Sequence, residues 1–212
     1  MTKRQQVQNP PKHDIGIAIL AGDAFFAHSE AFTKEWFGKD INPAPQLTGQ
    51  FISTLIASAT TLALGIELYL KALRMQAGLP IPKTHHLLSL YTDLPQEMTT
   101  AIEDQYERTK PSLPIGKAVG FELVLECGSV PPEVITQWED KKRKPPDHSL
   151  KALLERSSDA FNTWRYLHEV GREGELMIYS YEYGGLTAVA KSLRTILGPV
   201  GFISRDRRPN TR

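Results

Sequence analysis

The fold of this chain is decided by residues 51–94, which read FISTLIASATTLALGIELYLKALRMQAGLPIPKTHHLLSLYTDL. Apolar residues recur there at spacings of three and four, the pattern of a helix with one wide buried face. We expect this helix from about residue 50 to 77, a length of roughly 40 Å. Gly78 ends it, and Pro80 and Pro82 prevent it from resuming. The apolar positions are Ile52, Leu55, Ile56, Ala59, Leu62, Ala63, Ile66, Leu70 and Leu73.

Other stretches have the same helical period. Long helices are predicted over residues 14–38, 149–170 and 186–197, each with apolar residues on one side. Thr84 is a good N-cap for a short helix through Tyr91, and Pro95 suits the first turn of another through about Arg108. Several helices joined by short connections predict an all-α fold, an up-and-down antiparallel helical bundle around one core.

Residues 110–148 are the least regular part of the chain, and we expect them to form an irregular insertion into the bundle. Prolines and glycines interrupt this segment repeatedly. Within it, residues 121–126 suit either a short strand or a helical turn, and residues 132–138 suit a short helix. Farther along the chain, residues 175–183 are rich in residues that favour strands.

Charge divides the 212 residues into a body and two ends. The chain carries 25 lysines and arginines against 24 acidic residues, but seven of the bases and one of the acids lie in residues 1–13 and 201–212. Removing them leaves 18 basic and 23 acidic residues in the body. We therefore expect a single domain over residues 14–200, between a flexible N-terminal tail and a basic C-terminal tail. An acidic body disfavours strong non-specific binding of nucleic acid.

Several classes of site are excluded by what the sequence lacks. It has no glycine-rich phosphate loop, no H-E-x-x-H pair and no C-x-x-C, and its six histidines show no zinc-like spacing. We expect no metal and no cofactor. The single cysteine, Cys127, suits a reducing cytoplasm, either as a small buried residue or as a nucleophile with a distant histidine. Residues 41–66 lack charge, but serines and threonines interrupt them, so no membrane span is predicted.

Two groups of polar residues lie in this region, one in the helix predicted over residues 50–77 and one at the start of the short helix that follows it. Glu67 and Lys71 are four residues apart, in the order that favours an ion pair. The pair is either an exposed salt bridge or part of a seam between helices, where it could position a partner group. His85 and His86 follow Thr84; one of them is expected to close the start of the next helix, and either could bind an anion there.

The densest polar and aromatic cluster lies in the helix predicted over residues 149–170. Trp164 and Leu167 should point inward, so Arg165, His168 and Glu169 should share a neighbouring face. An arginine supplies fixed positive charge for a phosphate, and a histidine can exchange a proton near neutral pH. Metal-free RNA cleavage needs both groups. The other reading is an ion pair between Arg165 and Glu169 beside an ordinary surface histidine.

Three short pieces of the chain together resemble the HEPN (higher eukaryotes and prokaryotes nucleotide-binding) superfamily. They are residues 67–74 (ELYLKALR), residues 84–91 (THHLLSLY) and residues 161–169 (FNTWRYLHE). The resemblance spans roughly residues 50–195. It implies a helical bundle, frequent homodimerisation, and a function around RNA. Some members are metal-independent ribonucleases of toxin and defence systems, and others are inactive relatives that bind nucleotides or partner proteins. The positions that match the pattern are Glu67, Lys71, His85, Arg165, Tyr166 and Glu169.

The chain departs from the nuclease members at their signature, an arginine followed by four to six residues and a histidine. Arg165 and His168 have only two residues between them. We therefore expect a non-catalytic module that binds a nucleotide, RNA or a partner protein. The alternatives are an endoribonuclease that uses Arg165 and His168, and a purely structural interaction protein. A homodimer is expected through the uncharged face of the helix over residues 50–77, where Ala57, Ser58 and Gly65 are small.

Overall fold

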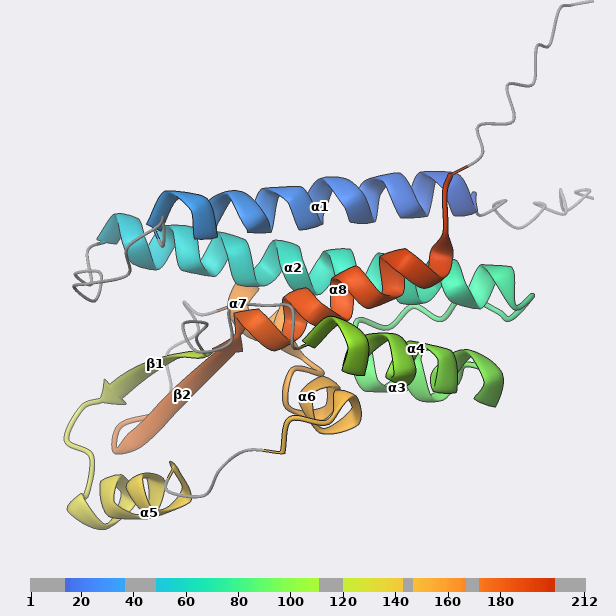
Figure 1. The fold of residues 1–212 in the computed structure, drawn as a ribbon. Helices are drawn as coiled ribbons and strands as arrows, with labels where there is room; N and C mark the ends of the chain where they lie inside the picture. The colour runs from blue at the N-terminus through green and yellow to red at the C-terminus, as the bar shows by residue number, and fades with distance from the viewer. Residues whose placement is uncertain (1–13, 37–48, 111–119, 143–146, 167–171, 201–212) are drawn as a thin grey trace, which may run out of the picture.

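The described part of the chain is mainly helical and contains one pair of strands (Figure 1). The computed structural model describes residues 14–36, 49–110, 120–142, 147–166 and 172–200. In chain order the elements are α1 (Ile15–Trp36), α2 (Gly49–Gln76), α3 (Leu87–Thr92), α4 (Gln96–Thr109), β1 (Gly120–Cys127), α5 (Pro132–Lys142), α6 (Leu150–Arg156), α7 (Ala160–Arg165), β2 (Glu175–Glu182) and α8 (Tyr183–Leu197).

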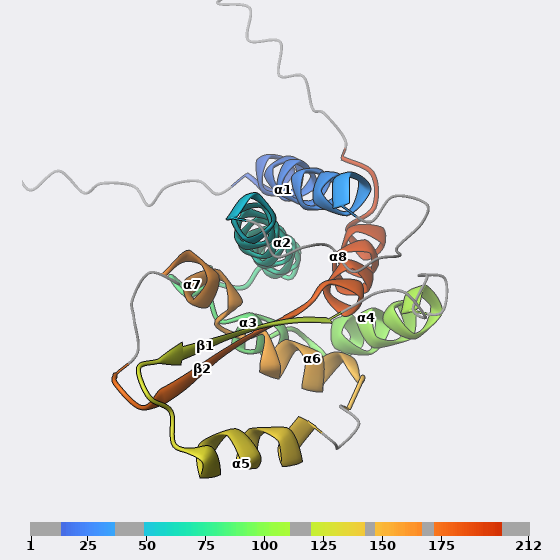
Figure 2. The same cartoon turned by 90° about the vertical axis from the view of Figure 1, so that its left-hand side faces the viewer.

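Helix α2 lies at the centre of the fold and contacts α1, α8, α7 and α3. Figures 1 and 2 show α1 lying along α2 with the opposite chain direction. Two glycines allow this close approach. A Cβ on Gly65 would lie 3.3 Å from the carbonyl oxygen of Gly22, and a Cβ on Gly22 would lie 2.6 Å from the ring of Tyr69. Because neither position has room for a side chain, α1 and α2 approach each other closely at this point.

The small residues of α2 serve this contact within the chain. Ser58 is buried, and its hydroxyl lies 3.2 Å from Ser29 Oγ of α1 and 3.0 Å from the Tyr181 hydroxyl of β2. Gly65 faces α1. Of the three small residues predicted to form a dimer surface, only Ala57 is exposed. The reason for placing a dimer contact on α2 is therefore wrong, since α1 already covers most of that surface.

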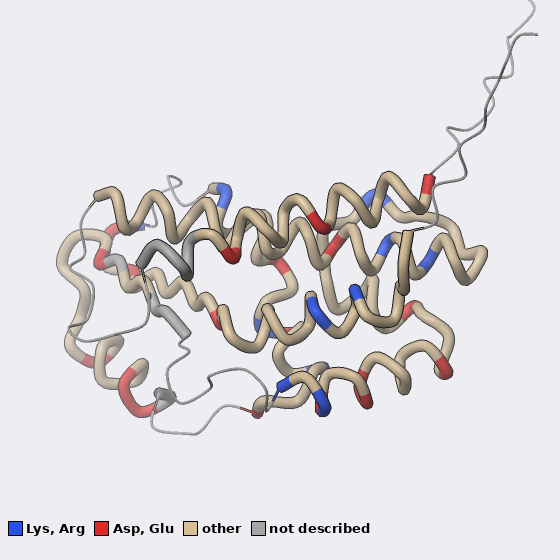
Figure 3. The backbone as a smooth tube through the Cα atoms, turned by 45° about the horizontal axis from the view of Figure 1, so that its top comes forward, with Lys and Arg blue, Asp and Glu red and all other residues tan. Residues whose placement is uncertain are grey.

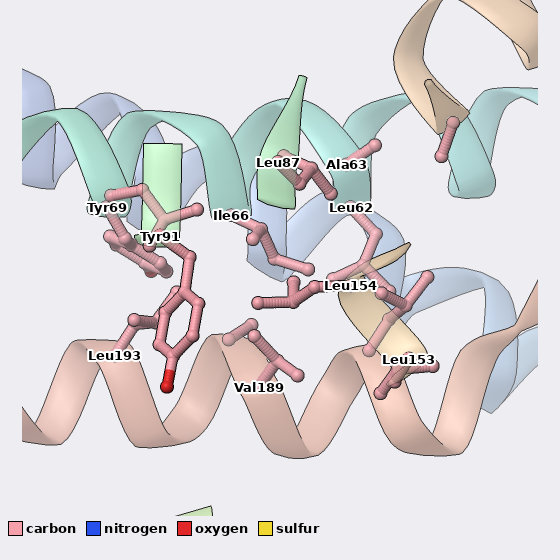
Figure 4. Close-up of a cluster of buried hydrophobic side chains, with 14 of the residues drawn as sticks. Leu62, Ala63, Ile66, Tyr69, Leu87, Tyr91, Leu153, Leu154, Val189 and Leu193 are labelled. Carbon is pink, nitrogen blue, oxygen red and sulfur yellow. The ribbon is translucent and has the colours of Figure 1, made fainter. Parts of the chain in front are cut away.

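The hydrophobic core lies between α2 and α8. Leu62 of α2 and Val189 of α8 are fully buried, and Figure 4 shows their side chains in one cluster to which α3 and α6 also contribute. From Leu55 onward, the predicted apolar stripe of α2 is buried, apart from the half-buried Ile56. The periodicity of α2 therefore gave its buried face correctly. The predicted helix over residues 186–197 is also confirmed, with three more residues at its start.

An antiparallel pair of strands makes the all-α prediction wrong in this one respect. Strand β1 pairs with β2 from Gly120 opposite Glu182 to Cys127 opposite Glu175. The region predicted as an irregular insertion thus contains β1 and α5. Tyr179 and Tyr181, two residues apart on β2, both point into the core, because side chains alternate along a strand. This packing of aromatic side chains favours a strand over a helix at residues 175–182.

The predicted helix over residues 149–170 is divided into α6 and α7. Between them, Ser158 hydrogen-bonds the start of α3: its carbonyl accepts from the Leu87 amide at 3.1 Å, and its hydroxyl accepts from the Leu88 amide at 3.1 Å. A continuous helix would use the Ser158 carbonyl for its own bonding. The chain instead breaks here because Ser158 satisfies amides that α3 cannot satisfy by itself. Residues 167–170 of the predicted helix lie outside the described residues.

Helix α2 is long and apolar enough, by length and composition, to cross a membrane. It is the one helix of this kind among the described residues, and half of its most apolar window is buried inside the structure. Core helices of soluble proteins meet the same criterion. The feature is therefore weak evidence for a membrane span.

Candidate functional site

The carboxylate of Glu67 lies inside the fold and binds two nitrogen atoms. Its side chain is 3% exposed. Lys71 Nζ lies 2.6 Å from Oε1, and His85 Nδ1 lies 2.8 Å from Oε2. Since a buried carboxylate is costly unless it is paired, both oxygens need these partners. Of the two readings of Glu67 and Lys71, the structure agrees with the seam between helices and not with an exposed salt bridge.

His85 lies in the connection between α2 and α3, with its side chain 43% exposed. The Glu67 carboxylate accepts hydrogen bonds, so the proton of the neutral imidazole belongs on Nδ1 and leaves Nε2 as an acceptor. The imidazole also lies against the ring of Phe161 in α7, with 4.7 Å between the ring centroids. Glu67 and Phe161 thus fix the orientation of a histidine that solvent can reach.

His86 has a different role from its neighbour. The helix predicted to begin at Thr84 begins at Leu87, and His86 is its N-cap, with Nδ1 accepting from the Ser89 amide at 3.3 Å. Thr84 accepts a hydrogen bond from the His86 amide at 3.1 Å and so orders the turn before the helix. The prediction that one of the two histidines closes this helix is confirmed for His86, which leaves the His85 side chain to Glu67.

Helix α7 brings a cation and two aromatic rings beside His85. Phe161 and Arg165 are four residues apart, so they lie on the same face of α7. The Arg165 guanidinium carbon lies 5.6 Å from the Phe161 ring centroid and 5.1 Å from the Tyr166 ring centroid. Trp164 is buried against Tyr181, with 5.8 Å between the centroids, and anchors α7 to the core. Arg165 and Tyr166 are both exposed.

These contacts form one continuous group, which we call the Glu67–Arg165 cluster. It comprises Glu67, Lys71, His85, Phe161, Arg165 and Tyr166.

The structure therefore brings together five of the residues predicted for the site. Phe161, which joins the two halves of the cluster, was not among the residues predicted for the site. Its spacing of four from Arg165 is the signal that could have identified it. His168 and Glu169 lie outside the described residues, so the pairing of Arg165 with His168 and that of Arg165 with Glu169 both stay predictions.

The cluster offers three kinds of interaction to a ligand. The Arg165 guanidinium provides a fixed positive charge with several donors, which suits a phosphate or carboxylate. Phe161 and Tyr166 provide ring faces. Nε2 of His85 can accept a hydrogen bond or a proton. Among the described residues, no group of three or more His, Cys, Asp or Glu side chains is placed to hold a metal ion.

Cys127 is buried at the end of β1. This position agrees with the reading of Cys127 as a small buried residue rather than as a nucleophile that a substrate can reach.

Comparisons of the chain with protein-family models, with curated proteins and with solved structures find no match.

Proposed function

We propose that this chain is a HEPN-like helical module that binds a nucleotide at the Glu67–Arg165 cluster without cleaving it. In this proposal the helices form an up-and-down antiparallel bundle, with α2 supplying the buried end of the cluster and α7 its exposed end. The observation that carries the proposal is the position of Arg165. Its guanidinium is exposed and lies over two aromatic rings, one of which also contacts the oriented imidazole of His85.

A nucleotide has the three features that these groups recognise. Its phosphate suits the Arg165 guanidinium, which can donate two parallel hydrogen bonds. Its base has a flat face that can stack on an exposed aromatic ring such as Tyr166, which is 40% exposed. Its hydroxyl or amino groups can donate to Nε2 of His85. A purely structural protein would not need a buried carboxylate whose main effect is to orient an exposed histidine.

Charge favours a single nucleotide or a short strand over a long RNA. A protein that follows an RNA backbone carries a strip of basic side chains, because each phosphate contact adds to the affinity. The body of this chain has more acidic than basic residues. Figure 3 shows lysines and arginines interspersed with acidic residues along the described part of the chain. One exposed arginine supports one phosphate contact.

Equilibrium titration tests this proposal directly. A nucleoside 5′-monophosphate should bind the purified chain, and the matching nucleoside without phosphate should bind at least about tenfold more weakly, because it lacks a charge-assisted hydrogen bond. Arg165→Ala should reduce the affinity for the monophosphate by a similar factor. Lys110→Ala is the matched control, because Lys110 Nζ also lies over an aromatic ring, that of Tyr106 at 5.4 Å, but at the C-terminal end of α4.

Two results would contradict the proposal. One is the absence of binding by any of the nucleoside monophosphates, and the other is equal loss of binding in Arg165→Ala and Lys110→Ala. Cleavage of single-stranded RNA by the folded protein in a metal chelator would favour the endoribonuclease alternative over a non-catalytic module.

A further inference from the structure

The solvent-facing side of α1 carries no charged side chain over four turns. The exposed residues of α1 from Ile15 to Ala31 include no Asp, Glu, Lys or Arg, and His28 is their one polar side chain. Ile17 is 66% exposed and Leu20 is 41% exposed. A surface helix normally has charged and polar residues on its outer face, so an apolar outer face indicates that another surface covers it. The apolar positions of this face, which we call the α1 stripe, are Ile17, Leu20, Ala24, Ala27 and Ala31.

The two acidic residues of α1 between Ile15 and Ala31 point elsewhere. Asp23 accepts hydrogen bonds from Arg194 Nε at 2.6 Å and from the Tyr69 hydroxyl at 2.7 Å. Glu30 lies 3.4 Å from Lys191 Nζ. Both acidic residues are therefore directed toward α8 or α2, along the side of α1 that packs inside the molecule. The α1 stripe is left as a neutral surface, which can be buried without removing a charge from water.

The spacing within the α1 stripe matches that of a helix that packs against another helix. Its residues are separated by three, four, three and four positions, the a and d positions of a heptad repeat. The large side chains, Ile17 and Leu20, lie at the N-terminal end, and the three alanines follow. A partner helix that fits this surface should therefore have small side chains opposite Ile17 and Leu20, and large ones opposite the alanines.

We propose that α1 pairs with α1 of a second copy of this chain in antiparallel orientation, with a two-fold axis near the middle of the α1 stripe. This orientation places Ile17 of one copy over Ala31 of the other, and Leu20 near Ala27, so large side chains meet small ones at both ends. A parallel pair would set Ile17 against Ile17 and hold the helices apart along the alanines. The stripe is complementary to itself only when the second copy is reversed.

Charge complementarity also favours the antiparallel pair. Reversed helices place the positive N-terminal end of one dipole beside the negative C-terminal end of the other.

This interface differs from the one predicted on α2. Helix α1 covers Ser58 and Gly65, so α2 cannot offer them to a second copy. The Glu67–Arg165 cluster contributes no residue to the α1 stripe, so a test of one proposal does not decide the other.

Light scattering on the full chain gives the first test. The wild-type protein should have the mass of a dimer, and Leu20→Glu should reduce it to a monomer, because two carboxylates would be buried in the interface. Ile178→Glu is the matched control, since Ile178 is 39% exposed and belongs to β2 rather than to α1, and this variant should remain a dimer. A wild-type monomer, or a dimer that survives Leu20→Glu, would overturn the proposal.

Cysteine cross-linking tests the orientation. Ala24→Cys lies near the two-fold axis, so it should form a disulfide-linked dimer on mild oxidation. Ile17→Cys alone should not, but it should cross-link when mixed with Ala31→Cys. The native Cys127 is buried, which keeps the background low, and the wild-type protein measures that background. Cross-linking of Ile17→Cys with itself would indicate a parallel pair, and no cross-linking at Ala24→Cys would indicate a different surface; either result overturns the proposal.

Discussion

Replacing Glu67 with glutamine perturbs the cluster at its buried centre while keeping the size of the side chain. In the wild-type protein, the carboxylate accepts from Lys71 Nζ at 2.6 Å and from His85 Nδ1 at 2.8 Å. Glutamine can still accept from one of these groups, but its amide nitrogen can only donate. If its oxygen stays with Lys71, its nitrogen must face His85, and the imidazole proton must move from Nδ1 to Nε2.

The stability cost of Glu67→Gln follows from the burial of the group. Removing one partner of a buried ion pair typically costs about 3–5 kcal/mol, because an uncompensated charge remains. Lys71 has a side chain that is 15% exposed and His85 one that is 43% exposed. Since both partners can be partly hydrated after the change, we expect the free energy of unfolding to fall by roughly 2–4 kcal/mol.

Urea unfolding measures this cost, provided that the slope of the transition is unchanged. Glu107→Gln is the matched control: Glu107 also pairs with a lysine, at 3.0 Å, but its side chain is 58% exposed. That variant should change the stability by less than about 0.5 kcal/mol. Nitrogen NMR of the His85 imidazole reports the tautomer. A cost for Glu67→Gln as small as that of the control, together with an unchanged tautomer, would refute the assigned role of Glu67.

Four further outcomes are expected. Leu62→Ala should lower the free energy of unfolding by roughly 2–5 kcal/mol in urea titrations, because Leu62 is fully buried; a loss below about 0.5 kcal/mol would contradict its place in the core. Gly22→Ala should destabilise and shift the ring of Tyr69, since the added Cβ would lie 2.6 Å from it; unchanged stability would show that α1 and α2 are farther apart. Burial raises the pKa of Tyr106 to about 12. The stability that this shift contributes is fully present below a pH of about 10, the pKa of tyrosine in the unfolded chain, and should be lost as the pH rises toward 12. The loss of stability over this range, followed by circular dichroism, should be shallower in Tyr106→Phe. Purified protein should show no robust ribonuclease activity; chelator-resistant cleavage that vanishes in a folded His168→Ala variant would reverse that conclusion.

Local patterns predicted the long helices well. The apolar spacing of α2 depends only on neighbours three and four residues away, so its bounds and most of its buried face follow from the sequence. The same holds for α8. The β1–β2 pair joins residues 120–127 to residues 175–182, and such a pairing between distant segments leaves no periodic signal in either one. The break at Ser158 likewise depends on α3, which is far away in the sequence.

The candidate site was predictable as a set of residue types but not as an arrangement. The spacing of Glu67 and Lys71 identified an ion pair, but burial of the carboxylate depends on α3 and α7 packing against α2. The contact between His85 and Phe161 joins residues more than seventy positions apart. Phe161 was missed because an aromatic residue at helical spacing is usually core.

The central claim is that the exposed end of the Glu67–Arg165 cluster binds a nucleotide, and the imidazole of His85 is the most direct probe of it. Nitrogen NMR should follow the Nε2 resonance of His85, assigned with a His85→Gln variant, as a nucleoside 5′-monophosphate is added. We predict a saturable change of this resonance in the wild-type protein and in Lys110→Ala, and its loss at the same ligand concentration in Arg165→Ala. A resonance that does not move in the folded wild-type protein, or that moves equally in Arg165→Ala, would contradict the account.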